Sequence, residues 1–136
     1  MKNRMKLLLA TAALGAVVIA GCSSSSTSAA VDTVAPATAA EIITTESNEV
    51  VLDIRTPEEY DQGIIEGAVN IDFYDDDFAV QLDALDKDAH YVVYCNSGNR
   101  SGQANSIFED LGFTDVTEID GGITAWYSEG LPVVLP

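Results

Sequence analysis

The sequence has few basic residues, one histidine and two cysteines, and each shortage argues against a class of protein. Lys and Arg number 6 against 22 Asp and Glu, so the formal net charge is −16. This balance argues against a nucleic-acid binder, because a phosphate backbone is bound by a surface rich in Lys and Arg. Cys22 and Cys95 are too few for a disulfide framework or a multi-cysteine zinc site, and His90 alone argues against a histidine-rich metal site. We therefore expect no metal and no cofactor.

The chain does have enough apolar residues for a core. They make up 47% of its 136 positions, which excludes disorder of the whole chain. This length allows one domain of ordinary size.

The N-terminus is typical of a secretion signal. Three basic residues within Met1–Lys6 precede an uncharged 14-residue stretch at 7–20. That stretch is too short to span a membrane as a helix and has the right length for the core of a signal peptide. The segment Ile19–Cys22 (IAGC) resembles the lipobox of bacterial lipoproteins. The resemblance implies removal of residues 1–21 and acylation of Cys22; an ordinary secretory signal with a coincidental cysteine is the alternative.

Lipidation would anchor the protein in the bacterial cell envelope. Ser23 stands where Asp would resemble an inner-membrane retention signal, so in a host with two membranes we expect the outer membrane, facing the periplasm. Residues 22–35, rich in Ser, Ala and Thr, are predicted to form a flexible tether, and residues 36–136 the folded domain. Cleavage would leave 3 basic residues and a net charge of −19. The three basic residues are Arg55, Lys87 and Arg100.

Apolar patterning within residues 36–136 alternates between strands and helices. Continuous apolar or β-branched runs predict strands at 49–54, 68–71, 90–94 and 115–119. Capping signals, apolar spacing and flanking glycines predict helices at 38–46, 56–63, 75–85, 104–111 and 121–130. The alternation indicates an α/β fold whose mainly parallel sheet is covered on both faces. Ligands bind such sheets at the carboxyl ends of the strands, which is where Cys95 lies.

The loop Cys95–Ser101 (CNSGNRS) joins the most apolar predicted strand to the next predicted helix. Its residues are the best candidates for a reactive site. A tight loop of this kind points backbone N–H groups at an anion, and the N-terminus of the helix adds partial positive charge. Gly98 permits backbone angles that a side chain would forbid, and Arg100 supplies a fixed cation. Such a cradle stabilises a thiolate and lowers its pKa. We therefore predict that Cys95 is a nucleophile; an inert core thiol is the alternative.

Several segments, in order along the chain, resemble the rhodanese family of sulfurtransferases. Leu52–Tyr60 (LDIRTPEEY) and Gly67–Ile71 (GAVNI) are similar to the family's first motif, and Cys95–Ser101 is similar to its active-site loop. Gly121–Trp126 (GGITAW) and Gly130–Val133 (GLPV) are similar to its closing motif. Each piece alone is weakly specific, but together they cover about residues 49 to 134. The resemblance implies a mainly parallel five-stranded sheet with helices on both faces.

One segment departs from the family pattern. Gly63–Ala68 (GIIEGA) stands where the family commonly has Gly-His-Ile-Pro-Gly-Ala, so the histidine and the proline are missing. That histidine usually lies outside the groups that touch substrate, so its absence bears on local packing more than on activity.

The resemblance also implies roles for individual residues. Cys95 and Arg100 would be catalytic, and Asp53 and Arg55 would support the loop, although a purely structural ion pair is an equally good interpretation of the latter two. Trp126 is expected in the core and Asp75–Asp77 at a helix start rather than at a metal. The residues expected to bind the substrate and the persulfide are Asn96, Ser97, Gly98, Asn99 and Ser101.

Loop length distinguishes two related chemistries. Four residues separate Cys95 from Arg100, whereas cysteine phosphatases and one class of arsenate reductase have five. The shorter loop fits one extra sulfur atom and favours sulfur transfer over phosphate hydrolysis. The resemblance implies a thiosulfate sulfurtransferase in which Cys95 takes sulfur from a thiosulfate-like anion and passes it to cyanide, a thiol or a protein acceptor. A non-catalytic binding module and a persulfide sensor are the alternatives, and we expect a monomer.

Overall fold

The computed structural model describes residues 30–136. The predicted signal peptide, Cys22 and the predicted tether up to residue 29 lie outside this part of the chain. Within residues 30–136, no helix is both long and apolar enough to cross a membrane. The elements, in chain order, are β1 (Val31–Val34), α1 (Pro36–Thr45), β2 (Glu49–Asp53), α2 (Pro57–Tyr60), β3 (Val69–Asn70), α3 (Phe78–Asp83), β4 (His90–Tyr94), α4 (Asn99–Asp110), β5 (Val116–Ile119) and α5 (Gly122–Ser128).

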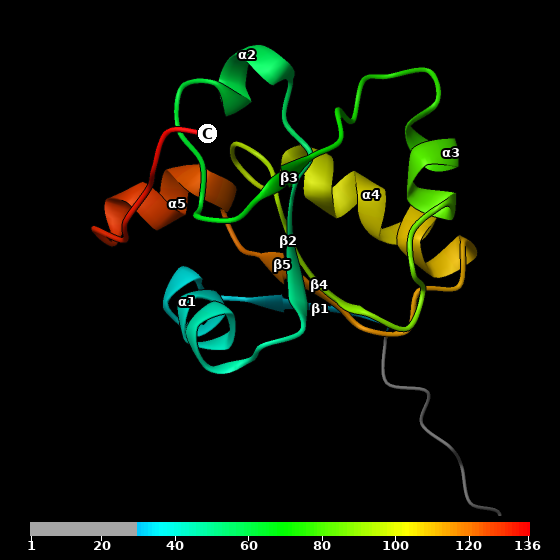
Figure 1. Cartoon of the computed structure of the whole chain (residues 1–136), viewed down its shortest axis with the longest axis horizontal. Coiled ribbons are helices and arrows are strands. Elements are labelled where there is room, and N and C mark those ends of the chain that lie inside the picture. Colours follow the sequence, from blue (N-terminus) through cyan, green and yellow to red (C-terminus); the bar gives the residue numbers. More distant parts are fainter. Residues whose placement is uncertain (1–29) are drawn as a thin grey trace, which may run out of the picture.

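The strands form one sheet with all pairings parallel (Figure 1). Their order across the sheet is β1-β5-β4-β2-β3, so β4 lies at the centre. Val92 of β4 pairs with Val51 of β2 on one side and with Thr117 of β5 on the other. The predicted five-stranded, mainly parallel sheet is confirmed. Because the strands are parallel, the segments that follow β2, β4 and β5 emerge at the same edge of the sheet.

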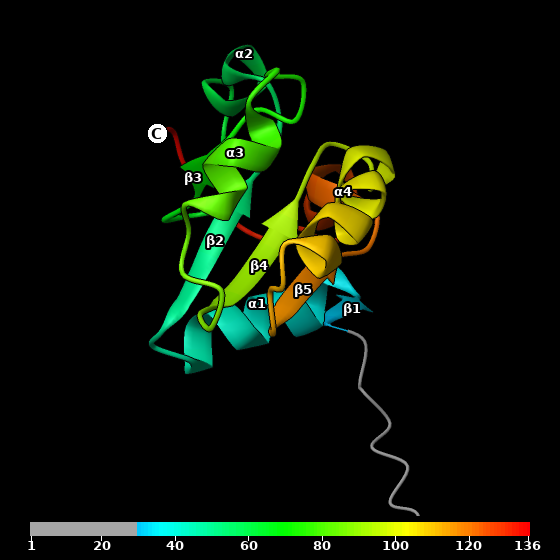
Figure 2. The ribbon, with the colours of Figure 1, turned by 90° about the vertical axis from the view of Figure 1, so that its right-hand side faces the viewer.

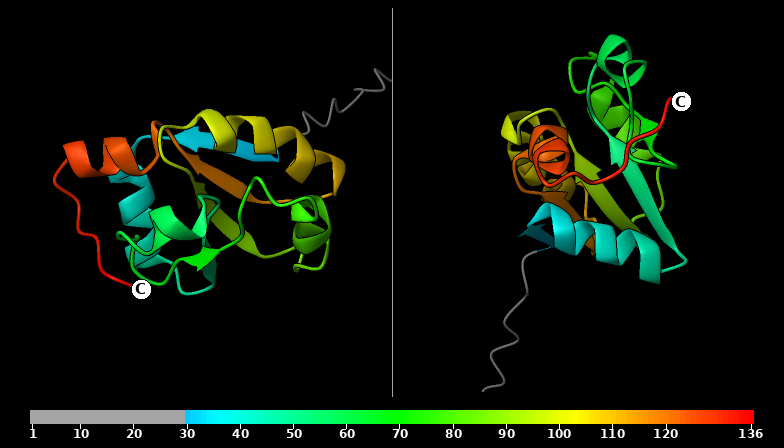
Figure 3. Two further views of the ribbon diagram at one scale, coloured as in Figure 1. Left: turned by 90° about the horizontal axis from the view of Figure 1, so that it is seen from above. Right: turned by 90° about the vertical axis from the view of Figure 1, so that its left-hand side faces the viewer.

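Helices cover both faces of the sheet. Seen from one side, α3 and α4 lie in front of the strands, and seen from the opposite side α1 and α5 do (Figures 2 and 3). Successive side chains of β4 point to opposite faces, so Val93 joins the core beneath α3 and α4 while Val92 joins the core beneath α1 and α5. Each fully buried aliphatic side chain in these cores contributes about 1.5–3 kcal/mol to stability.

The folded domain begins earlier than predicted, because β1 lies within the segment 22–35 that was expected to be a tether. Val31 pairs with Val116 and Val34 with Ile119, which makes β1 an edge strand beside β5. The side chains of Val31 and Val34 are half-buried against the two cores. An edge strand needs few apolar residues, so the Ser/Ala/Thr-rich composition of the segment gave no signal for β1.

Local capping signals were informative at one helix and misleading at another. The predicted capping box at α2 is confirmed: the Thr56 hydroxyl accepts from the Glu59 N–H at 3.4 Å, and the Glu59 carboxylate accepts from the Thr56 N–H at 3.1 Å. The capping box predicted at Thr38 and Glu41 is wrong. There α1 begins at Pro36, whose fixed φ angle suits the first helical position, and no side chain caps it.

The other predicted elements agree with the structure apart from their ends. The strands β2, β3, β4 and β5 differ by at most one residue at either end. Helix α3 is shorter than the predicted 75–85, and Asp77 precedes it without a side-chain capping bond. Helix α4 begins at Asn99, ahead of the apolar face that predicted it, because its first turn belongs to the cysteine loop and not to the core.

The C-terminal segment runs back beside the loop that follows α2 (Figure 3). Ile64 and Val134 exchange two backbone hydrogen bonds of 2.8 and 2.9 Å. The Trp126 indole N–H donates to Pro132 O at 2.9 Å, and its side chain is buried as predicted. The C-terminal segment is thus held against the segment that follows α2.

Candidate active site

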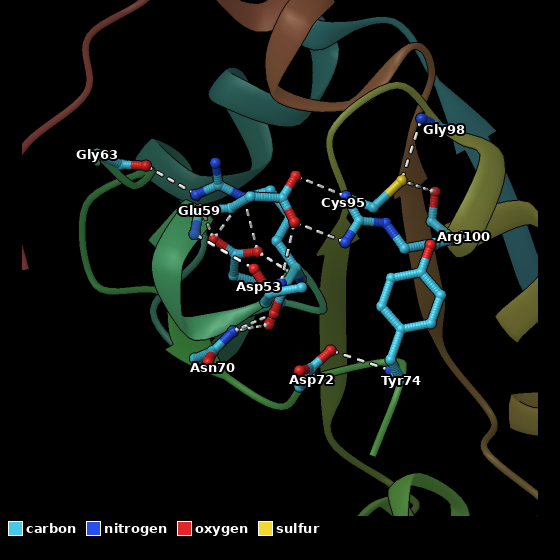
Figure 4. A network of polar contacts seen from close by, with 12 residues as sticks. Asp53, Glu59, Gly63, Asn70, Asp72, Tyr74, Cys95, Gly98 and Arg100 are labelled. Carbon is cyan, nitrogen blue, oxygen red and sulfur yellow. Dashed lines mark hydrogen bonds and ion pairs between the residues drawn. The ribbon is translucent and has the colours of Figure 1, made fainter. Parts of the chain in front are cut away.

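Cys95 directly follows the central strand, β4, and is fully buried at the carboxyl edge of the sheet. Its Sγ accepts a hydrogen bond from the Gly98 N–H at 3.1 Å and lies 3.5 Å from the Ser101 hydroxyl (Figure 4). Gly98 has a φ angle of +89°, a left-handed conformation that suits glycine. The structure thus brings together three of the predicted site residues around one sulfur atom.

The loop changes the pKa of the Cys95 thiol in two directions. Burial is the largest effect and raises the pKa, because it penalises the charged thiolate. Hydrogen bonds from the Ser101 hydroxyl and from the backbone N–H groups of Ser101, Gly98 and Ser97 lower it. The hydrogen bonds together outweigh burial, so the pKa of Cys95 lies below its ordinary value. This is the direction expected for a nucleophilic cysteine.

The start of α5 binds the carbonyl groups of the loop. The Ile123 N–H donates to Cys95 O at 2.9 Å, and the Thr124 N–H donates to Asn96 O at 3.0 Å. These carbonyls are therefore held by α5, while N–H groups of the loop face Sγ. A Cβ atom at Gly122 would lie 2.5 Å from Cys95 O and 2.8 Å from Asn96 O, so only glycine permits this close approach.

Three predicted loop residues have side chains that point to solvent: Asn96, Ser97 and Asn99 are all exposed. The Asn99 amide oxygen accepts from the Gln103 side chain at 2.7 Å, one turn further along α4. What Asn96 and Ser97 contribute to the site is backbone: one carbonyl held by α5 and one N–H directed at sulfur.

Arg100 does not present a free charge to the sulfur. Its Nη1 and Nη2 donate to the two carboxylate oxygens of Glu59 at 2.7 and 2.8 Å, a bidentate ion pair (Figure 4). The expectation that Arg100 is simply the cation of the cradle needs this correction, because Glu59 balances its charge. The hydrogen bond to Glu59 is the main cause of the raised pKa of Arg100, and the charge of Cys95 also raises it. The guanidinium therefore remains within electrostatic reach of the sulfur.

An exposed aromatic ring lies over this ion pair. The Tyr74 ring centroid is 5.4 Å from the Arg100 guanidinium carbon, and 66% of Tyr74 is exposed. The backbone N–H of Tyr74 donates to the Asp72 carboxylate at 3.0 Å (Figure 4). Tyr74 thus forms part of the solvent-facing border of the site.

Asp53 and Arg55 form a buried ion pair at the end of β2. Arg55 Nη2 lies 2.6 Å from Asp53 Oδ2 and also donates to Gly63 O at 2.7 Å (Figure 4). The Arg55 guanidinium carbon is 5.5 Å from the ring centroid of Tyr94. Through Gly63, Arg55 holds the start of the segment 63–68, which lacks the histidine and proline common in the family, against the end of β2. The geometry favours the structural interpretation of this pair.

Sequence reasoning missed two carboxylates of the site. Glu59 was recognised only as a helix cap, and its second role, pairing with Arg100, depends on a contact between residues 41 positions apart. Glu118 of β5 is 5% exposed and accepts a hydrogen bond from the Ser101 hydroxyl at 2.6 Å. The one sequence signal for Glu118 is an acid inside a strand expected to be buried on both faces.

The class of protein is defined by a parallel sheet with a buried cysteine, of lowered pKa, in an N–H-lined loop at its carboxyl edge. A family model described as the rhodanese-like domain matches residues 35–129, and the chain belongs to that family. The resemblance seen in the sequence motifs is thereby confirmed.

Individual relatives are moderately identical to the chain. The chain is 38% identical over 87 residues to a sulfurtransferase of Allochromatium vinosum, covering 64% of this chain and 79% of that protein. It is 42% identical over 84 residues to the thiosulfate sulfurtransferase GlpE of Pseudomonas paraeruginosa, covering 61% and 74%. The crystal structure of a rhodanese-related protein from Thermoplasma volcanium matches with a TM-score of 0.68 and 34% identity, covering 76% of this chain and 98% of that one.

Replacing Gly122 by Ala should destabilise the protein more than replacing Gly112 by Ala. Both glycines have positive φ angles, +60° and +83°, so both substitutions cost about 1–2 kcal/mol of backbone strain. Only the Cβ at position 122 would meet other backbone atoms, which adds about 1–3 kcal/mol of overpacking; at Gly112 nothing lies within 4 Å. Urea denaturation measures both losses. Equal losses would contradict the close approach of α5 to the cysteine loop.

The ion pair between Glu59 and Arg100 predicts a specific loss of stability in acid. Hydrogen bonding to Arg100 is the main reason that the pKa of Glu59 is lowered from 4.5 to about 2, against an opposing effect of burial. A folded-state pKa below the unfolded one stabilises the fold at neutral pH, and this contribution disappears as pH falls from 4.5 towards about 2. The difference in unfolding free energy between wild type and Glu59→Gln should therefore shrink across that range. If urea titrations give a difference independent of pH, Arg100 does not hold Glu59 in this way.

Proposed function

We propose that the protein is a sulfurtransferase that moves a sulfane sulfur from a thiosulfate-like donor to a thiophilic acceptor through a persulfide on Cys95. The observation that carries the proposal is the loop around Sγ: its hydrogen bonds lower the pKa of Cys95 and surround the sulfur with donors. Membership of the rhodanese-like family and the names of the relatives, among them thiosulfate sulfurtransferases, support the same activity.

In the first half-reaction the Cys95 thiolate attacks the outer sulfur of thiosulfate. A bond forms between Sγ and that sulfur, the sulfur–sulfur bond of thiosulfate breaks with its electron pair, and sulfite leaves. The negative charge of the thiolate becomes the charge of the persulfide, so no oxidant or reductant is needed. Backbone N–H groups of Ser97, Gly98 and Ser101 are in position to stabilise this anion, as they stabilise the thiolate.

In the second half-reaction a nucleophile removes the outer sulfur. Cyanide, a thiol or a protein thiolate attacks that atom, the persulfide bond breaks, and Cys95 returns as a thiolate. The ion pair of Arg100 with Glu59 lies beside the loop, under the exposed ring of Tyr74. We infer that the Arg100 charge, largely balanced by Glu59, orients the arriving anion rather than binding it tightly.

The test uses mass spectrometry and a cyanide-dependent thiocyanate assay on the protein produced without its signal peptide. Thiosulfate should add one sulfur atom to Cys95, and Cys95→Ser should abolish both this adduct and thiocyanate formation. Cys22→Ser is the matched control and should leave both unchanged. Thiocyanate formation that survives Cys95→Ser would refute the proposal. A stable adduct without turnover would favour a persulfide sensor instead.

We further propose that the protein is a bacterial lipoprotein anchored through Cys22 in the cell envelope. The basic start of the chain, the short apolar stretch and the lipobox-like Ile19–Cys22 support this. In cells supplied with a labelled fatty acid, wild type and Cys95→Ser should carry the label and partition with membranes, and Cys22→Ala should do neither. Labelling of Cys22→Ala would exclude this site of lipidation.

A further inference from the structure

A buried carboxylate lies directly behind the cysteine loop, between β5 and α4. Glu118 is 5% exposed, although burial of a charged carboxylate is costly unless it is paired or hydrogen-bonded. Among the ion pairs of residues 30–136, none involves Glu118. Neutral donors hold it instead: the Thr33 hydroxyl and the Asn105 amide donate to Oε2 at 3.1 and 2.7 Å, and the Ser101 hydroxyl donates to Oε1 at 2.6 Å.

Ser101 connects this carboxylate to the nucleophile. Its Oγ lies 3.5 Å from Cys95 Sγ and 2.6 Å from Glu118 Oε1, so one hydroxyl bridges the two groups. A hydroxyl has a single proton to donate. When Cys95 is a thiol, the S–H donates to Ser101, which donates to the Glu118 carboxylate. When Cys95 is a thiolate, the sulfur also needs the Ser101 proton, and an ionised Glu118 would compete for it.

We propose that Glu118 is the proton acceptor of Cys95, acting through Ser101. The proton of Sγ moves to Ser101 Oγ while the hydroxyl proton of Ser101 moves to Glu118 Oε1. The products are a thiolate, which accepts a hydrogen bond from Ser101, and a neutral carboxylic acid, which donates to Ser101. One S–H and one O–H bond break, two O–H bonds form, and the net charge of the three groups is unchanged.

The hydrogen-bond pattern selects the oxygen that takes up the proton. Oε2 already accepts from two donors, whereas Oε1 accepts from Ser101 alone. After the transfer Asn105 and Thr33 keep their bonds to Oε2, so no donor is left without an acceptor. Neither side chain has to leave its place, because each proton moves along an existing contact.

The groups around Cys95 and Glu118 favour one negative charge on this pair over two. On the face of β4 that looks towards α4, the titratable groups are Cys95 and Tyr91, and the Tyr91 hydroxyl is engaged with Asp86 O. From α4, Ser101 and Asn105 face Glu118, and the charge of Arg100 is directed to Glu59. From β1 the neutral Thr33 faces it. Because no cation forms an ion pair with Glu118 within residues 30–136, a thiolate and a carboxylate joined by one hydroxyl repel each other, and we expect their ionisation to be coupled.

The same constraint applies to the persulfide of the proposed function. The persulfide carries its negative charge on the outer sulfur, which is bonded to Sγ. That charge would still lie close to Glu118, so Glu118 would stay protonated while Cys95 carries sulfur. The proton would return to the sulfur when the free thiol is restored. Glu118 therefore acts on the negative charge of Cys95 through Ser101. It is a positioning residue and does not touch the substrate.

The test is a titration of the thiolate by its ultraviolet absorbance, taken as the difference from Cys95→Ser in a Cys22→Ser background. In wild type, Cys95 should ionise in two steps separated by more than about one pH unit, because the first proton is shared with Glu118. In Glu118→Gln, Cys95 should ionise in one step. Its proton affinity in that step should be at least tenfold lower than in the upper of the two steps of wild type. Thr33→Val, the matched control, removes one bond to Oε2 and should keep two steps.

A single step in wild type, or two steps that persist in Glu118→Gln, would overturn the proposal. A merely structural Glu118 would leave the shape of the curve unchanged. Infrared difference spectra of wild type provide a second readout that needs no variant to fold: conversion of the thiol to the persulfide should produce the carbonyl band of a protonated carboxylic acid. Absence of that band would also overturn the proposal. The titration uses no sulfur donor, so it stands even if sulfur transfer itself fails its own test.

Discussion

The site depends on the contact between the start of α5 and the two carbonyl groups that follow β4. Because Ile123 and Thr124 bind Cys95 O and Asn96 O, the loop turns so that its N–H groups face the sulfur. That contact exists only because position 122 has no Cβ. Helix α5 thus holds the loop whose hydrogen bonds lower the pKa of Cys95, although none of those bonds comes from α5 itself.

Three carboxylates belong to the site and its supports in this acidic protein, and each is stabilised in a different way. Asp53 pairs with Arg55, and Glu59 pairs with Arg100. Glu118 has only neutral donors. Two of the three basic residues outside the predicted signal peptide are therefore committed to carboxylates beside the site, which leaves the backbone as the main stabiliser of a sulfur anion. Under the proposed function, a site built this way would favour a small anion attached to Cys95 over a large free one.

Local signals in the sequence predicted much of what is local in the structure, although the capping box expected at Thr38 was wrong. Strand β4 and the capping box at Thr56 were found because their residues carry the pattern by themselves. Cys95, Gly98 and Ser101 were found because one short loop holds them all. Glu59 and Glu118 were missed because their partners lie 41 and 17 residues away, and β1 was missed because an edge strand needs little apolar surface. Such features depend on the order of strands in the sheet, which no single segment specifies.

The direction of β1 also separates the start of the described chain from the site. The chain enters the sheet at the amino end of β1, and since all strand pairings are parallel, Cys95 lies at the opposite edge. With the proposed lipid on Cys22, the point of attachment would lie nine positions before Val31, at the start of β1. The edge of the sheet that holds Cys95 would then be the one farther from the lipid attachment, on the side of dissolved molecules and other proteins. The lipid would hold the enzyme in its compartment without competing for its site.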